Sequence, residues 1–127
     1  QEWRSSSSYL DPESNIITTY YYSTTTRNPY DTVAVLYDAN THTILSATGF
    51  TNSRASLDVD VSQMTLTSSM LRSDGSVATR IYQSSPDAYG TMLKVSLRYD
   101  PYGTLYDASQ TVIQPLDLKK VKLPPLL

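Results

Sequence analysis

The chain has 127 residues, a formal net charge of −2 and no cysteine. This length fits one domain with its own core, and the lack of cysteine excludes disulfides, thiolate nucleophiles and zinc–thiolate sites. Lys and Arg are dispersed apart from "KKVK" at 119–122, and no apolar run is long enough for a membrane span. We therefore expect that the protein does not bind nucleic acid and does not span a membrane.

The composition is rich in hydroxyl groups, with 18 Ser and 16 Thr against 4 Lys. This balance is typical of exported, cell-surface and virion domains. The chain begins with Gln1 where a nascent chain would carry Met, which indicates a processed mature form or an excised fragment, with processing the favoured interpretation. We therefore expect an extracytoplasmic location: secreted, in the cell envelope or on a virion surface.

The N-terminal half predicts a loop followed by strands. Residues 1–14 have no hydrophobic period and carry four serines in a row, so they are predicted to form an arm. "IITTYYY" at 16–22 is β-branched and aromatic, as strands favour. "TVAVLY" at 32–37 is apolar on both faces, which indicates a central strand, and "TILSATGF" at 43–50 is its expected partner.

The second half continues the strand pattern. "LDVDV" at 57–61 alternates, with Leu, Val and Val predicted inward and the two Asp outward. Residues 62–72 fit strand or helix, and strand is the favoured interpretation. "VATRIYQ" at 77–83 follows an Asp-Gly turn, and "TMLKVSLRY" at 91–99 has the clearest single apolar face.

A last strand is predicted at 104–113, before a Pro-rich tail at 114–127. About eight short strands with frequent turn signals and no convincing helix predict an antiparallel β-sandwich, immunoglobulin-like or jelly roll. The predicted organisation is an arm at 1–14, a sandwich domain at 15–113 and a tail at 114–127.

The sequence offers little for catalysis or cofactor binding. His42 is the one histidine, so a serine triad lacks partners and a histidine metal site lacks ligands. Asp38, Asn40 and His42 alternate as calcium ligands do, but the spacing fails further on because position 49 is Gly instead of the required Glu. We predict no enzyme activity, no cofactor and no metal.

Tyrosine is the one enrichment that points to binding, with 11 Tyr against one Phe and one Trp. Tyr30, Tyr89 and Tyr102 lie in the proline-containing turns "NPYD", "SPDAYG" and "DPYG". Tyrosine gives a large rigid contact area with a polar tip, which suits binding loops. These three are the candidate contact residues, and packing over the ends of the fold is the alternative.

The hairpin "VAVLYDANTHTIL" at 33–45 is similar to the strand-turn-strand signature of the FxLYD domain, a small β-sandwich of bacterial envelope proteins with no known catalytic role. The likeness covers this hairpin alone, and Val35 stands where the signature has Phe. It implies an envelope-type sandwich without catalysis. The same hairpin also resembles "VSLRYDPYGTLYD" at 95–107, but the residues inside the two turns differ. The likeness therefore indicates the residue preferences that hairpins share, and not a duplicated functional site.

The leading hypothesis is a non-catalytic module that serves as a structural or adhesive subunit of a surface assembly, with other protein subunits as homo- or hetero-oligomeric partners. A carbohydrate-binding module that uses the turn tyrosines on a glycan is the first alternative. A virion protrusion or spike domain is the second.

Overall fold

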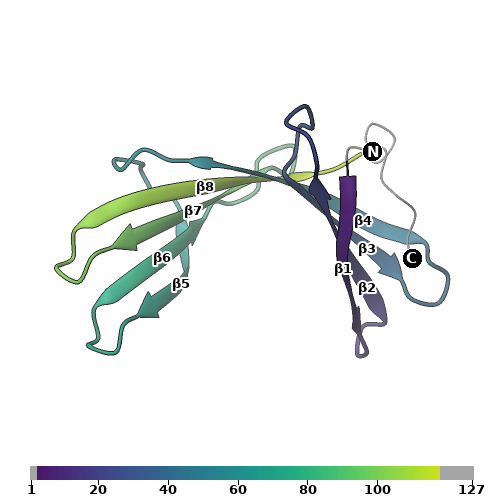
Figure 1. Ribbon diagram of the computed structural model, residues 1–127, viewed down its shortest axis with the longest axis horizontal. Helices are drawn as coiled ribbons and strands as arrows, with labels where there is room; N and C mark the ends of the chain where they lie inside the picture. Colours follow the sequence, from purple (N-terminus) through teal and green to yellow (C-terminus); the bar gives the residue numbers. More distant parts are fainter. Residues whose placement is uncertain (1–2, 118–127) are drawn as a thin grey trace. The chain divides into compact units, whose positions relative to one another are not determined.

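The computed structural model describes residues 3–117, without the side chain of Ser6, as eight β-strands and no helix (Figure 1). The all-β prediction and the number of strands are confirmed. The strands are β1 (Trp3–Asp11), β2 (Ile16–Ser23), β3 (Thr32–Asp38), β4 (Ile44–Arg54), β5 (Thr65–Leu71), β6 (Val77–Gln83), β7 (Met92–Tyr99) and β8 (Leu105–Pro115). No helix in this part of the chain could cross a membrane.

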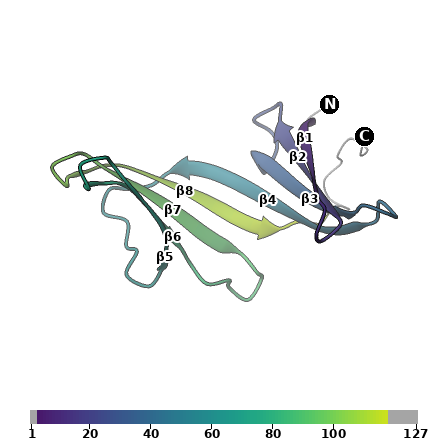
Figure 2. The same ribbon diagram turned by 90° about the horizontal axis from the view of Figure 1, so that it is seen from below.

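The described residues divide into two compact units: the second is Asn52–Ile113, and the first consists of the described residues on either side of it in the chain. The first contains the antiparallel meander β1-β2-β3-β4, and the second contains the meander β5-β6-β7-β8 (Figure 2). Face-to-face packing of two sheets, which defines a sandwich, stays a prediction, as do the domain limits 15–113. "KKVK" and the last part of the predicted tail lie outside the described residues.

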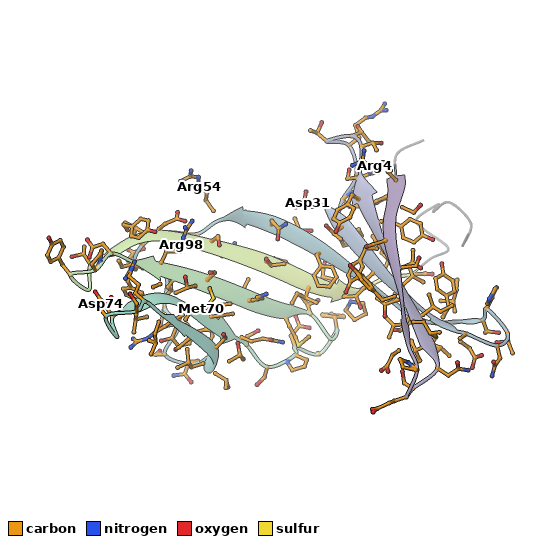
Figure 3. All side chains as sticks on the ribbon, turned by 60° about the horizontal axis from the view of Figure 1, so that its bottom comes forward. Arg4, Asp31, Arg54, Met70, Asp74 and Arg98 are labelled. Carbon is orange, nitrogen blue, oxygen red and sulfur yellow. The ribbon has the colours of Figure 1, made fainter. Side chains whose placement is uncertain are left out.

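The predicted N-terminal arm is wrong for residues 3–11, which form β1 and pair with β2 from Trp3 to Asp11. Trp3 anchors one end because it is only 4% exposed, and the Ser8 and Thr19 hydroxyls bond across the strands at 2.9 Å. Arg4, labelled in Figure 3, belongs to the same strand. The serine run misled the prediction because strand formation here depends on pairing with β2, which overrides local propensity.

The strand predicted at 57–61 is also wrong, since the segment between β4 and β5 is irregular. Local hydrogen bonds fold it, with the Ser62 backbone N–H donating to the Asp60 carboxylate at 2.9 Å. Such side-chain to backbone bonds compete with a strand ladder. Val59 and Val61 still face the core as predicted, whereas Leu57 is exposed. The strand prediction within 62–72 is confirmed by β5.

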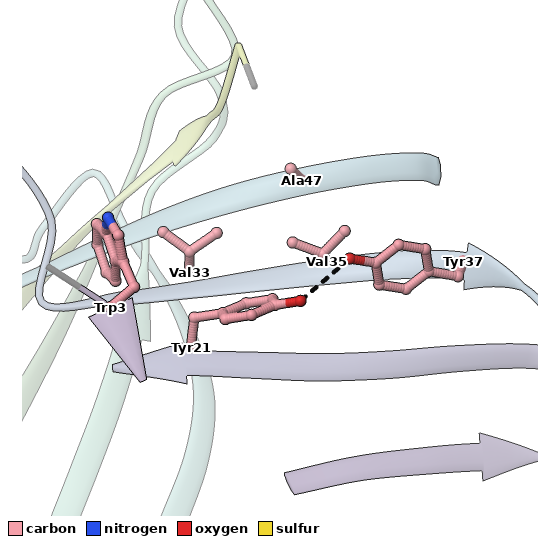
Figure 4. Close-up of a cluster of buried hydrophobic side chains, with 6 residues drawn as sticks. All are labelled: Trp3, Tyr21, Val33, Val35, Tyr37 and Ala47. Atoms are coloured by element: carbon pink, nitrogen blue, oxygen red, sulfur yellow. Dashed lines mark hydrogen bonds between the residues drawn. The ribbon is translucent and has the colours of Figure 1, made fainter. Parts of the chain in front are cut away.

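The core of the first unit is an aromatic and aliphatic cluster on one face of the meander (Figure 4). Tyr21, Val33 and Val35 are fully buried. The Tyr21 and Tyr37 hydroxyls lie 3.2 Å apart and form a buried hydrogen bond. Burial, and then the bond to Tyr37, raise the pKa of the Tyr21 hydroxyl above its usual range.

The core of the second unit lies on the face of β7 that the sequence predicts. Val95 and Leu97 are buried, and Leu93 and Tyr99 pack against them. Ala108 of β8 completes this cluster, and residues 55–64 supply apolar side chains that pack onto it. The irregular segment thus covers one face of this sheet in place of a further strand.

Substitution of Tyr21 by Phe should destabilise the protein by about 1–3 kcal/mol, because the buried Tyr37 hydroxyl loses its partner. Tyr21→Phe combined with Tyr37→Phe should cost less than the sum of the two single changes, since no orphan hydroxyl remains. Denaturant unfolding followed by Trp3 fluorescence measures this. Tyr22→Phe, at an exposed position of β2, is the matched control. A Tyr21→Phe variant as stable as the parent contradicts the prediction.

Candidate ligand and partner sites

The structure does not bring the three candidate tyrosines together. Tyr30 is half-buried in the first unit, where its ring packs against the core cluster. Tyr89 and Tyr102 belong to the second unit and are 86% and 93% exposed. They flank β7 at opposite ends, and its eight residues span roughly 25 Å. Packing therefore accounts for Tyr30, while Tyr89 and Tyr102 have no packing role in this unit.

Tyr89 and Tyr102 occupy the same position in two copies of one turn. Residues 87–91 and 100–104 both read Asp-x-Tyr-Gly-Thr. In each copy the Asp carboxylate accepts the Tyr N–H at 2.8 or 2.9 Å and the Thr N–H at 3.0 or 2.9 Å. Each Gly has a positive φ, 79° and 85°, which residues with a side chain rarely adopt. The repeated pentapeptide is a sequence signal for a pair of matched, outward-facing tyrosines, although the prediction of Tyr89 and Tyr102 above rests on their proline-containing turns instead.

A cavity of about 440 Å³ lies between the β5–β6 turn and the β7–β8 turn, within the second unit. Tyr102 and the ring of Tyr99 supply its aromatic surface. The Arg80 guanidinium also lines it and sits 5.7 Å from the centre of the Tyr99 ring, in cation–π contact. The lining residues are Gly75, Ser76, Val77, Arg80, Tyr99, Asp100, Pro101, Tyr102 and Gly103.

Arg72 ties the two sides of this cavity together. Its guanidinium donates to the Val77 carbonyl at 3.0 Å and to the carbonyl of Tyr99, the last residue of β7. A third bond reaches the Ser76 hydroxyl at 3.3 Å. One planar side chain with several donors therefore links the β5–β6 turn to the start of the β7–β8 turn. The sequence gives no hint of this tie, because Val77 and Tyr99 are distant in the chain.

Asp74 stiffens the β5–β6 turn. Its carboxylate accepts the Ser76 hydroxyl at 2.6 Å and the Ser76 N–H at 2.9 Å. These two bonds, with a smaller contribution from the charge of Arg72, lower the pKa of Asp74. The turn is therefore held by an ionised carboxylate at neutral pH.

A second candidate site is the edge strand β5, whose one partner among the described strands is β6. All seven residues of β5 are exposed, including the large apolar side chains of Leu66, Met70 and Leu71. Figure 3 labels Met70 on this strand and Asp74 at the turn after it. Two register shifts interrupt the ladder near its ends, so Ser68, Ser69 and Met70 form its regular centre.

The structure shows turn chemistry around His42. His42 is exposed with a φ of 58°, and the Asp38 carboxylate accepts the N–H groups of Asn40 and Thr41 at 2.8 and 3.0 Å. The bonds from Thr41 and Asn40 lower the pKa of Asp38. Within residues 3–117, no three His, Cys, Asp or Glu side chains are grouped to hold a metal ion.

Comparisons with known proteins give no relative for this chain: no family model, curated protein or solved structure matches it.

Gly49→Ala should destabilise the first unit by about 1–3 kcal/mol, because an added Cβ would lie 2.4 Å from the Tyr30 ring. Combining it with Tyr30→Ala should recover part of this loss, because the obstacle is removed. Thermal and denaturant unfolding measure both effects, and Ser46→Ala, exposed on the same strand, is the control. Equal stability of Gly49→Ala and the parent would show that Tyr30 does not pack there.

Asp74→Asn tests the ionised turn. Because the folded pKa of Asp74 is lowered, its stabilising contribution is present above the unfolded pKa of about 3.9 and is lost as pH falls through the folded pKa. The parent should therefore be more stable than Asp74→Asn at pH 7, and the difference should close in acid. Free energies of unfolding across this pH range test it, and a difference that does not change with pH contradicts it.

Proposed function

We propose that this protein is a non-catalytic structural or adhesive subunit of an assembly outside the cytoplasm, and that copies of it join through β5. The observation that carries this proposal is an edge strand exposed along its whole length. An open edge presents unpaired N–H and C=O groups, which another strand can complete by β-augmentation.

The composition of β5 supports this role because it lacks the charged residues and the proline that protect many edge strands, although register shifts interrupt its pairing near both ends. Its sequence, "TLTSSML", contains no proline and no charged residue. Charged side chains and proline are the common means by which edge strands avoid pairing. The register shifts near both ends of β5 leave its centre, from Ser68 to Met70, regularly paired with β6.

Apolar side chains on both faces of β5 supply contact area for an incoming strand. Leu66 pairs with Tyr82, which is in register with the buried Val95. Met70 pairs with Thr79, which is in register with the exposed Arg98 on the opposite face. The side chains of an added strand would therefore pack beside Leu66 on one face of the sheet and beside Met70 on the other.

A second copy of the chain is the partner that suits β5 best. Antiparallel pairing of two copies about Ser69 would set Ser68 of each against Met70 of the other, as a two-fold interface requires. No like charges meet, because β5 is uncharged. The hydroxyl-rich composition supports the extracytoplasmic location.

Met70→Lys should weaken self-association by about tenfold or more, because two lysines would be brought to the centre of the paired edges. Sedimentation equilibrium and light scattering across a wide concentration range give the dimerisation constant. Hydrogen exchange of the β5 amides adds a local readout, with slower exchange expected at high concentration.

Tyr89→Lys is the matched control, since it adds the same charge at an exposed turn outside β5. It should leave association unchanged. A parent chain that stays monomeric at high concentration, with β5 amides that exchange at a constant rate, contradicts the proposal.

A further inference from the structure

We propose that the cavity between the β5–β6 and β7–β8 turns binds a neutral saccharide, with the Tyr102 ring as its stacking platform. Its volume of about 440 Å³ falls within the range of small-molecule sites, about 300–1,000 Å³. The lining combines two tyrosines with one guanidinium and one carboxylate. A saccharide presents apolar C–H faces together with hydroxyls that both donate and accept, which matches this set.

A turn that is held by hydrogen bonds exposes Tyr102 to solvent. The Asp100 carboxylate fixes the backbone N–H groups of Tyr102 and Thr104, both at 2.9 Å, and Gly103 takes the positive φ that the turn needs. The ring itself is 93% exposed, so the fold gains nothing from burying it. A rigid aromatic surface loses little conformational entropy on binding, which favours its use as a contact.

Polar groups beside Tyr102 can donate to and accept from hydroxyls. Arg80 forms no ion pair among the interactions described for residues 3–117, so its N–H groups are available to a ligand beside the Tyr99 ring. The Oδ1 atom of Asp100 serves the turn, which leaves Oδ2 to accept from a ligand hydroxyl. The cavity therefore offers a donor from Arg80 and an acceptor from Asp100, and the turn bonds hold the acceptor in place.

The charges lining the cavity favour a neutral ligand. Arg80 and Asp100 are its ionisable lining groups of opposite sign, so a carboxylated or sulfated sugar would meet the carboxylate and an amino sugar would meet the guanidinium. A neutral sugar bonds to both without repulsion. Gly75 leaves the wall open, because a Cβ built there has no atom within 4 Å.

Tyr89 is the control for Tyr102, because the two tyrosines lie in turns of the same sequence pattern. Tyr89 has the same turn geometry and nearly the same exposure as Tyr102, but it does not line the cavity. If exposure alone produced binding, both would contribute equally. The proposal assigns binding to Tyr102 because Arg80 and Asp100 lie beside it.

The test begins with the 127-residue chain on an array of neutral, acidic and amino glycans, followed by titration of the ¹⁵N-labelled protein with the neutral oligosaccharide that binds most tightly. Binding should shift the Gly75 and Gly103 amide resonances. Tyr102→Ala should weaken binding by about tenfold or more, which corresponds to about 1.4 kcal/mol. Tyr89→Ala should leave the affinity unchanged, and Arg80→Gln should weaken binding without unfolding the protein.

Several results would overturn the proposal: no neutral glycan bound at millimolar concentration, a preference for charged glycans, or equal losses in Tyr89→Ala and Tyr102→Ala. A protein segment seated on Tyr102 in place of a sugar would give the first of these. The outcome is independent of the β5 proposal, because Tyr102 lies outside that strand and Met70→Lys leaves the cavity lining intact.

Discussion

Aspartate side chains that close turns are the interaction on which this structure depends. In each case a carboxylate accepts the N–H of the residue two places further on, at Asp11, Asp38, Asp60, Asp74, Asp87 and Asp100. Such bonds let the chain reverse within a few residues, so that each strand can pair with its predecessor. Five of these bonds lie in the β1–β2, β3–β4, β5–β6, β6–β7 and β7–β8 connections. In the β2–β3 loop the Ser23 hydroxyl takes this place, because it donates to the Thr25 carbonyl and accepts from the Asn28 amide. At Asp60 the same bond helps hold an irregular segment, which covers the second core.

The closed turns also decide which residues reach solvent. A turn that is held by its own Asp and Gly needs no side chain packed over it. The position between the Asp and the Gly that carries tyrosine in two of these turns is therefore free to hold any residue. Two of these turns carry tyrosine, and both rings point away from the protein. In the β7–β8 turn the ring stands beside a cavity whose sides are linked by Arg72. The turn geometry and the bonds of Arg72 together make Tyr102 a candidate ligand contact. Tyr89 has the same turn geometry without the cavity, so it serves as the control for Tyr102.

The second unit thus carries two candidate contact surfaces of different chemistry. β5 offers backbone groups and apolar side chains, which suit another strand. The tip of the hairpins offers an aromatic ring, a donor and an acceptor, which suit a polyhydroxyl ligand. A subunit that assembles through one surface and contacts a glycan through the other would be an adhesive module.

Local patterns in the sequence determined the all-β class, most of the strands and the inward face of β7, because alternation and turn residues act over a few neighbours. They also singled out Tyr89 and Tyr102, and the repeated Asp-x-Tyr-Gly-Thr pentapeptide carries the same information. Tertiary structure alone decided that a serine-rich stretch becomes β1, that 57–61 forms no strand, and that Tyr30 packs against Gly49 while Tyr102 borders a cavity. These outcomes depend on which distant segments pair and on where a long side chain such as Arg72 finds its acceptors, and a sequence read in short windows does not contain that information.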